Sequence, residues 1–218
     1  MDEIDITLAK NGIKAALDVA KDFLTKLAGP ASEEVGLLLQ DRVRVYRLKN
    51  QVRMLAKAQK MLRDAGIDPN SVPLRTLVPI LEGASLEDDE YLSTKWAGLL
   101  ASVASGQNQL TSHPSYANIL AQLSPNEAKY LDQLAQLVEL KQDTLHQDQS
   151  DYRSFKRSMM KDLGFSEQEA QIIWQNLFRL GLCYMTGTSD EPKKRFLKMS
   201  MFGFHFVQIC SGPHKTTQ

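Results

Sequence analysis

Apolar residues recur at steps of three and four along most of this 218-residue sequence. That spacing is typical of an α-helix with one buried face. The first such segment stops at Gly29-Pro30 and carries Ile13, Leu17, Ala20, Leu24 and Leu27. Hydrophobic residues make up 43% of the chain, which is enough to build a core. The pattern therefore predicts a folded, mainly α-helical protein.

Proline, glycine and capping residues divide residues 1–123 into a predicted helical bundle. A long basic helix is expected over 30–65, because Pro30 suits a first helical turn and Gly66 suits a C-terminal cap. At about 1.5 Å per residue this helix would be roughly 50 Å long. A short helix is expected within 67–85. Ser85, followed by acidic residues, is expected to cap a third long helix with the apolar face Tyr91, Leu92, Trp96, Leu99, Leu100 and Val103.

From residue 124 the sequence predicts a second module. Ser124-Pro-Asn-Glu127 has the form of a capping box, and Ser166-Glu-Gln-Glu169 opens a later helix. Residues 182–200 contain two short apolar runs around a Gly/Ser/Asp/Pro turn, which predicts a β-hairpin. A last short helix follows. This order of three helices, a hairpin and a closing helix predicts a winged-helix-like module over 124–210, followed by a disordered tail over 211–218.

Positive charge is concentrated in the predicted helix 30–65. Residues 42–63 include eight basic residues and no acidic one, although the whole chain has 26 of each sign and no net charge. At about 100° per residue, six of these cations fall within about a third of the helix circumference, beside the buried face. The candidate binding surface on this helix consists of Arg42, Arg47, Lys49, Asn50, Arg53, Lys57, Lys60 and Arg63.

Three interpretations of this basic surface are open. Residues 82–90 contain five carboxylates, so the sequence favours internal pairing with this segment, or plain solvation of the cations. A contact surface for a protein partner comes second. Binding of nucleic acid or of an anionic lipid surface comes third, because a run of charge is by itself a weak motif.

The predicted winged-helix-like module carries a second candidate basic surface. The third helix of that module would approach DNA with Glu167 and Glu169, whose carboxylates would repel phosphates. Contact with protein, or dimerisation, is therefore favoured over DNA binding for this module. The secondary basic surface consists of Arg153, Lys156, Arg157, Lys193, Lys194 and Arg195.

No catalytic residue, metal site or cofactor is predicted. The four histidines lack zinc-binding spacing, and the sequence has no Gly-rich phosphate loop or nucleophile elbow. Cys183 and Cys210 lack CxxC spacing and are expected to be reduced core residues. The consecutive carboxylates of 87–90 suit a helix N-terminus better than a metal ion.

No apolar run reaches the ~18–20 residues that span a bilayer, and the N-terminus is not a secretory signal, so a cytosolic protein is expected.

Several short phrases follow one another in order over residues 25–210. They include Tyr46-Arg-Leu-Lys-Asn50, Leu81-Glu-Gly-Ala-Ser-Leu-Glu-Asp-Asp-Glu90, Trp96-Ala-Gly-Leu-Leu-Ala101 and Leu123-Ser-Pro-Asn-Glu-Ala128. In this order they resemble the Abi-alpha family of bacterial all-helical proteins, which are associated with abortive infection, a form of defence against phage. The resemblance implies a role in antiphage defence and supplies no catalytic residue or cofactor.

The predicted function is therefore that of a non-enzymatic component of antiphage defence, which senses or binds a phage or host protein. The alternative is a nucleic-acid-binding module that uses the basic stripe of 42–63 and the hairpin. A homo-oligomer is compatible with both predictions.

Overall fold

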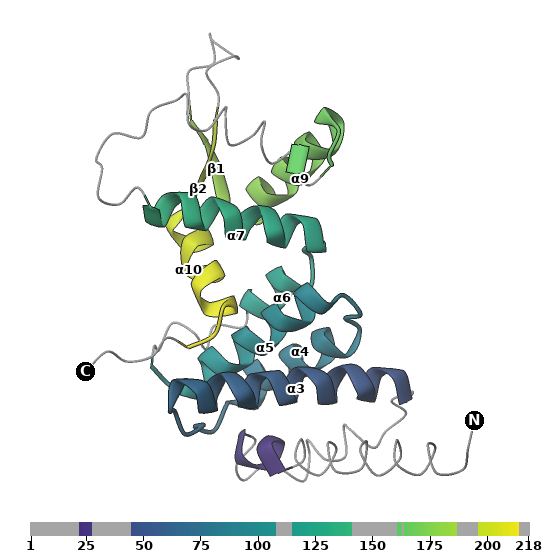
Figure 1. Ribbon diagram of the computed structural model, residues 1–218, viewed down its shortest axis with the longest axis vertical. Helices are drawn as coiled ribbons and strands as arrows, with labels where there is room; N and C mark the ends of the chain where they lie inside the picture. The colour runs from purple at the N-terminus through teal and green to yellow at the C-terminus, as the bar shows by residue number, and fades with distance from the viewer. Residues whose placement is uncertain are drawn as a thin grey trace. The chain divides into compact units, whose positions relative to one another are not determined.

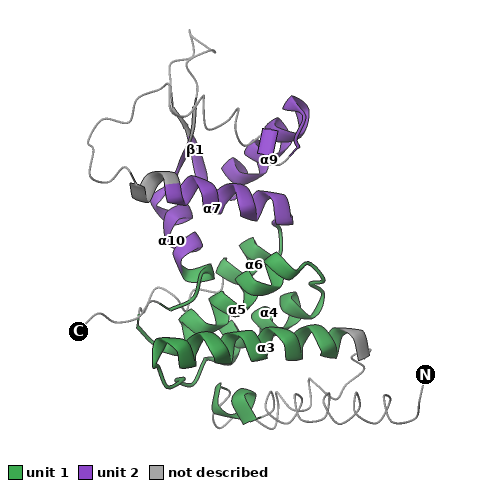
Figure 2. Ribbon diagram, in the orientation of Figure 1, with its two compact units in different colours: residues 1–122, 209–218 green, residues 123–208 purple. Residues whose placement is uncertain are grey.

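A computed structural model of the chain describes residues 22–27, 45–107, 115–140, 161–162, 164–186 and 196–213. These residues are mainly helical, with one small antiparallel sheet, which confirms the predicted fold class (Figure 1). The chain divides into two compact units (Figure 2). Unit 1 comprises Met1–Gln122 together with Ile209–Gln218, and unit 2 comprises Leu123–Gln208. Unit 2 is therefore enclosed in the sequence between two segments of unit 1.

Four helices form most of the described part of unit 1. They are α3 (Val45–Ala65), α4 (Leu74–Ser85), α5 (Glu90–Ser105) and α6 (Ser115–Leu120). Helix α3 lies alongside both α4 and α5 (Figure 1). It ends as predicted, because Gly66 has a left-handed φ of 71° and donates its N–H to the Arg63 carbonyl. The predicted start of this helix at Pro30 lies outside the described residues.

The start of α5 differs from the prediction. Ser85 is the last residue of α4, and the N-cap of α5 is Asp89. The Asp89 carboxylate accepts hydrogen bonds from the N–H groups of Tyr91 (2.9 Å) and Leu92 (3.0 Å). Serine and aspartate are both good N-cap residues, so the sequence alone did not decide between them.

The core of unit 1 is built where α4 and α5 approach closely. The Trp96 side chain on α5 is only 1% exposed, and its ring lies against Gly83 of α4. A Cβ atom on Gly83 would overlap the indole ring, so this position requires glycine. Of the other residues on the predicted apolar face of α5, Leu92, Leu99, Leu100 and Val103 are buried, whereas Tyr91 is half-buried.

The end of the chain contributes to unit 1. The Ser102 hydroxyl of α5 donates a hydrogen bond of 2.8 Å to the Ile209 carbonyl. Gly98 of α5 faces the Cys210 carbonyl so closely that a Cβ atom would overlap it. The predicted disordered tail begins too early at residue 211, because residues 211–213 are among the described residues and Gly212 is buried. Residues 214–218 lie outside them.

Unit 2 contains the elements predicted from capping and turn signals. They are α7 (Pro125–Leu140), α9 (Glu167–Arg179), β1 (Cys183–Thr186), β2 (Phe196–Met199) and α10 (Met201–Cys210), the last of which ends in unit 1. Strands β1 and β2 pair antiparallel with Cys183 opposite Met199, which confirms the hairpin. The helix expected over 152–163 lies almost entirely outside the described residues, so the winged-helix arrangement stays a prediction.

Two capping boxes fix the starts of α7 and α9. The backbone N–H of Ser124 donates to the Glu127 carboxylate (2.7 Å), and the Glu127 N–H donates to the Ser124 hydroxyl (3.3 Å). Ser166 and Glu169 repeat this pattern at the start of α9. Glu127 also accepts a hydrogen bond of 2.8 Å from the Asn176 side chain, which joins α7 to α9. One glutamate thus serves both a cap and a contact between helices.

Both cysteines of the sequence are buried and free, as expected. Burial raises the pKa of the Cys183 thiol to about 12, because the charged thiolate would be desolvated. Cys183 is therefore protonated and poorly nucleophilic at neutral pH.

Candidate functional site on helix α3

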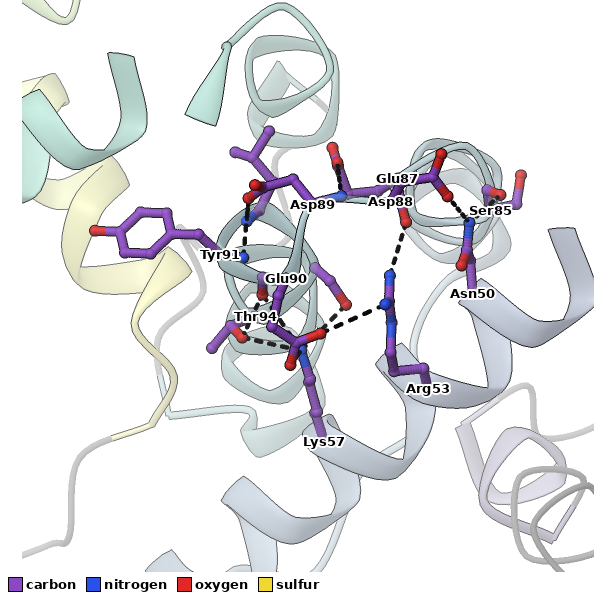
Figure 3. Close-up of polar contacts among 12 residues, drawn as sticks. Asn50, Arg53, Lys57, Ser85, Glu87, Asp88, Asp89, Glu90, Tyr91 and Thr94 are labelled. Carbon is purple, nitrogen blue, oxygen red and sulfur yellow. Dashed lines mark hydrogen bonds and ion pairs between the residues drawn. The ribbon is translucent and has the colours of Figure 1, made fainter. Parts of the chain in front are cut away.

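The predicted binding surface on α3 divides into two groups of residues. Arg42 lies outside the described residues. Asn50, Arg53 and Lys57 turn toward the segment Ser85–Glu90, which we call the α4–α5 corner (Figure 3). Arg47 also contacts this corner, through Ser85. Lys49, Lys60 and Arg63 are instead exposed. The two groups have different surroundings.

The α4–α5 corner brings together the ends of two helices. Helix α4 ends with the Leu86 and Glu87 N–H groups donating to the carbonyls of Gly83 (3.2 Å) and Ala84 (3.3 Å). The Glu87 carboxylate then accepts from the N–H of Asp89 (2.9 Å), the residue that caps α5. The corner thus combines the carbonyl end of α4, which attracts cations, with a group of carboxylates near the start of α5.

Asn50 of α3 bridges the two parts of the corner. It is only 5% exposed, and its side-chain N–H₂ donates to the Ser85 carbonyl (3.3 Å) and to the Asp88 carboxylate (3.0 Å). The carbonyl of Ser85 is one of those at a helix end that no further turn can satisfy. Asn50 therefore acts as a side-chain cap for α4.

Two other α3 side chains support the end of α4. The Arg47 guanidinium donates to the Ser85 hydroxyl (3.1 Å), which itself donates to the Glu82 carbonyl (2.6 Å). The Gln51 amide donates to the Leu81 carbonyl (3.1 Å) from a buried position. Gln51 was missed by sequence reasoning. The available signal was a polar residue placed among the apolar residues of the helix, next to Asn50.

Arg53 and Lys57 make the contacts to the acidic side of the corner. Arg53 donates to the Glu87 carbonyl (2.9 Å) and lies 3.4 Å from the Glu90 carboxylate. Lys57 lies 2.6 Å from the same carboxylate and also donates to the hydroxyls of Ser93 (3.3 Å) and Thr94 (3.0 Å). These contacts confirm that this part of the basic surface pairs internally with the acidic segment 82–90.

The corner shifts the pKa values of two glutamates in opposite directions. The hydrogen bond from Lys57 lowers the pKa of Glu90, with the charges of Lys57 and Arg53 adding to the effect. Partial burial raises the pKa of Glu87, although its hydrogen bond from the Asp89 N–H opposes this change. The ionised form of Glu90 is thus favoured by the fold, and the ionised form of Glu87 is disfavoured.

Glu90→Gln and Glu87→Gln are expected to change stability with opposite sign. A lowered pKa means that Glu90 stabilises the fold above its unfolded pKa of about 4.3, and that this contribution is lost as the pH falls through the folded value. Because the Glu90 side chain is 70% exposed, the loss in Glu90→Gln at pH 7 should be about 0.5 kcal/mol or less. Glu87→Gln should instead stabilise the protein at pH 7, since it removes a partly buried charge.

Urea unfolding of both variants at pH 3, 5 and 7 measures these differences. The raised pKa of Glu87 means that its contribution is favourable below its unfolded pKa and is lost as the pH rises through the folded value. Both differences from the native protein should therefore shrink as the pH falls, and the Glu90 difference should persist to lower pH, because the pKa of Glu90 is lowered and that of Glu87 is raised. A loss of stability in Glu87→Gln at pH 7 would contradict the proposed cost of its burial.

The second group of residues faces away from the core. The side chains of Lys49, Lys60 and Arg63 are exposed, and they have no hydrogen bond or ion pair to any residue in the part of the chain that the structure describes. At about 100° per residue they lie, together with the exposed Ala56, within an arc of about 60° on α3. The buried residues Met54, Ala58 and Leu62 lie on the opposite side.

The secondary basic surface is not placed by the structure. Arg153, Lys156, Arg157, Lys193, Lys194 and Arg195 all lie outside the described residues. Of the two glutamates predicted to repel DNA, Glu169 has a structural role. Its hydrogen bonds with Ser166 lower the pKa of its carboxyl, so it is an ionised cap at neutral pH.

The consecutive carboxylates of the corner are directed to separate protein partners (Figure 3). Within the described ranges no three His, Cys, Asp or Glu side chains gather in a way that could hold a metal ion. The helices in those ranges also include none that combines the length and the apolar character needed to cross a membrane.

The sequence matches one protein family, described as Abortive infection alpha, over residues 49–210. The match includes most of α3, all of the α4–α5 corner and the described elements of unit 2. No curated protein and no solved structure matches the chain. Since the matched region covers most of the sequence, the chain belongs to the abortive infection alpha family.

Proposed function

We propose that this protein is a non-enzymatic component of bacterial antiphage defence, which acts by binding a protein of phage or host origin. The assignment to defence is supported by the family, whose description names abortive infection. In abortive infection an infected cell stops growing or dies before phage progeny are released. Such a response needs a component that recognises the infection and a component that acts on the cell.

The observation that carries the non-enzymatic part is the polar network of the α4–α5 corner. Asn50, Arg53 and Lys57 each contact main-chain carbonyls or side chains of that corner. Their partners are a helix end and a helix cap, so the network holds three helices of unit 1 together. Polar groups that catalyse a reaction must instead be free to contact a substrate. The richest polar cluster on α3 therefore has a structural role.

Phage challenge of bacteria that express the chain tests the assignment to defence. We expect plaque numbers for at least one phage to fall by about tenfold or more relative to an empty vector. Infected cells should also lose viability without releasing progeny. Expression with unchanged plaque numbers across a broad phage panel, including phages of the native host, would contradict this assignment.

Incubation of the purified protein with RNA and DNA tests the non-enzymatic assignment. With Mg²⁺ or Mn²⁺ present we expect both nucleic acids to remain intact, and metal-dependent cleavage would overturn the proposal.

A titration with a 20-base-pair duplex at several salt concentrations tests the alternative function. A steep loss of duplex affinity with salt would favour nucleic-acid binding, since each phosphate contact releases a counterion.

A further inference from the structure

The exposed side of α3 presents positive charge that has no negative partner among the residues that the structure describes. Lys49, Lys60 and Arg63 lie along one line on the helix, and Ala56 lies between them on the same line. Lys49 and Arg63 are about 21 Å apart along the helix axis, at about 1.5 Å per residue. We call these four residues the outward face of α3. None of them belongs to the network at the α4–α5 corner.

We propose that the outward face of α3 is a docking surface for an acidic helix of a protein partner. This inference rests on the proposed function, because it names the surface and the class of partner through which that function would work. The other cations of α3 are excluded from the surface, since Arg47 contacts Ser85, and Arg53 and Lys57 contact Glu90.

The construction of α3 suits such a role. On the side opposite the outward face, buried residues such as Met54 and Leu62 pack into the core. Between these two sides, Asn50 and Lys57 form hydrogen bonds to α4 and α5. A surface on a helix that is fixed in this way is presented without further ordering of the backbone. The small side chain of Ala56 leaves room for a partner helix to approach between the longer lysine side chains. Charge on such a surface determines which partner binds and how fast the two proteins associate, more than it determines the affinity of the complex.

The number of cations favours a protein over nucleic acid. A protein that contacts about 6–10 phosphates of a duplex needs more cations than the three that the outward face offers. Three carboxylates on one side of a partner helix would equal these cations in number and could extend over the same length of helix. The spacing of 11 and 3 residues between Lys49, Lys60 and Arg63 is itself a helical spacing, so a parallel or antiparallel acidic helix can follow it.

A defined acidic peptide tests this inference directly. The probe is a labelled helical peptide of about 21 residues with glutamates on one face, and its control carries glutamine at the same positions. Fluorescence anisotropy at low salt measures binding to three proteins, namely the native chain, Lys49→Glu/Lys60→Glu, and Lys26→Glu/Arg75→Glu. The two variants change the net charge equally, and all four positions are exposed. We expect the first variant to bind the acidic peptide at least tenfold more weakly, and the second to stay within about twofold of the native chain.

Ala56→Arg separates docking from general charge attraction. This variant adds a positive charge but fills the centre of the outward face. We therefore expect it to weaken binding of the acidic peptide, whereas simple charge attraction would strengthen it. Circular dichroism checks that each variant is folded. The inference is overturned if the peptide binds the native chain and Lys49→Glu/Lys60→Glu equally, if it does not bind at all, or if only a 20-base-pair duplex distinguishes these two proteins.

The phage challenge separates this inference from the proposed function. If the native chain gives no protection, the proposed function is wrong. If the native chain and Lys49→Glu/Lys60→Glu protect equally, the function stands and the docking surface is wrong. We expect protection to be lost in Lys49→Glu/Lys60→Glu and kept in Lys26→Glu/Arg75→Glu, with both variants present at native levels in the cell.

Discussion

Trp96→Ala is expected to lower the free energy of unfolding by about 3–5 kcal/mol, the range for removing a large aromatic side chain from a core. Trp96 is 1% exposed and is the largest of the fully buried side chains among the described residues. Its ring lies against Gly83 of α4, where a Cβ atom would overlap the indole. Removing the ring leaves a cavity that two helices fixed by the α4–α5 corner cannot readily close.

A double-mutant cycle with Gly83→Ala identifies the contact that is lost. Alone, Gly83→Ala should destabilise the protein by about 1–3 kcal/mol, because the new methyl group overlaps the indole ring. In the Trp96→Ala background the same methyl group enters the cavity, so its cost should disappear. Urea unfolding of the four proteins gives the coupling energy. Additive effects would show that the ring does not occupy the space above Gly83.

The ends of several elements could be predicted because their signals are local in the sequence. Ser124 and Glu127 are three residues apart, and so are Ser166 and Glu169, so each capping box is contained within one helical turn. Gly66 ends α3 through its own left-handed conformation. The same locality explains the misassigned cap of α5. Ser85 and Asp89 offer equivalent local signals, and Ser85 is used instead by the Glu82 carbonyl and by Arg47.

The division of the basic surface could be predicted only in part. The charge pattern predicts pairing between α3 and residues 82–90, and the contacts of Arg53 and Lys57 with Glu90 confirm it. A helical projection places Lys57 and Lys60 in the same third of the circumference. It does not give the direction from which α5 approaches, and this direction leaves Lys57 paired and Lys60 exposed. The position of a neighbouring helix is a property of the whole core.

The return of the chain to unit 1 could not be predicted from local signals at all. Ser102 and the Ile209 carbonyl that it binds are 107 positions apart. Gly98 resembles an ordinary small residue of an apolar helix, and only the approach of the Cys210 carbonyl shows why glycine is present. Sequence reasoning detects patterns within one element, whereas this contact joins a helix near the middle of the chain to a segment near its C-terminus.

Gly98→Ala is therefore expected to destabilise the protein by about 1–3 kcal/mol, as overpacking does, although alanine favours the helical backbone by about 1 kcal/mol. The added methyl group would overlap the Cys210 carbonyl, and a main-chain carbonyl at the end of α10 cannot rotate away as a flexible side chain can. We expect the strain to be relieved by displacement of residues 209–212 from α5. Ser102→Ala is the matched variant, because it removes the hydrogen bond to Ile209 without adding any volume.

The two buried cysteines report where the change occurs. Cys210 lies at the contact with Gly98, whereas Cys183 lies in β1 of unit 2 and serves as an internal reference. In Gly98→Ala the Cys210 thiol should react with a thiol reagent at least tenfold faster than in the native protein, while Cys183 stays protected. Ser102→Ala should produce a smaller change in the same direction. Equal acceleration at both cysteines would indicate global unfolding. Protection of both, despite lost stability, would show that the end of α10 stays in place and that the strain is absorbed within α5.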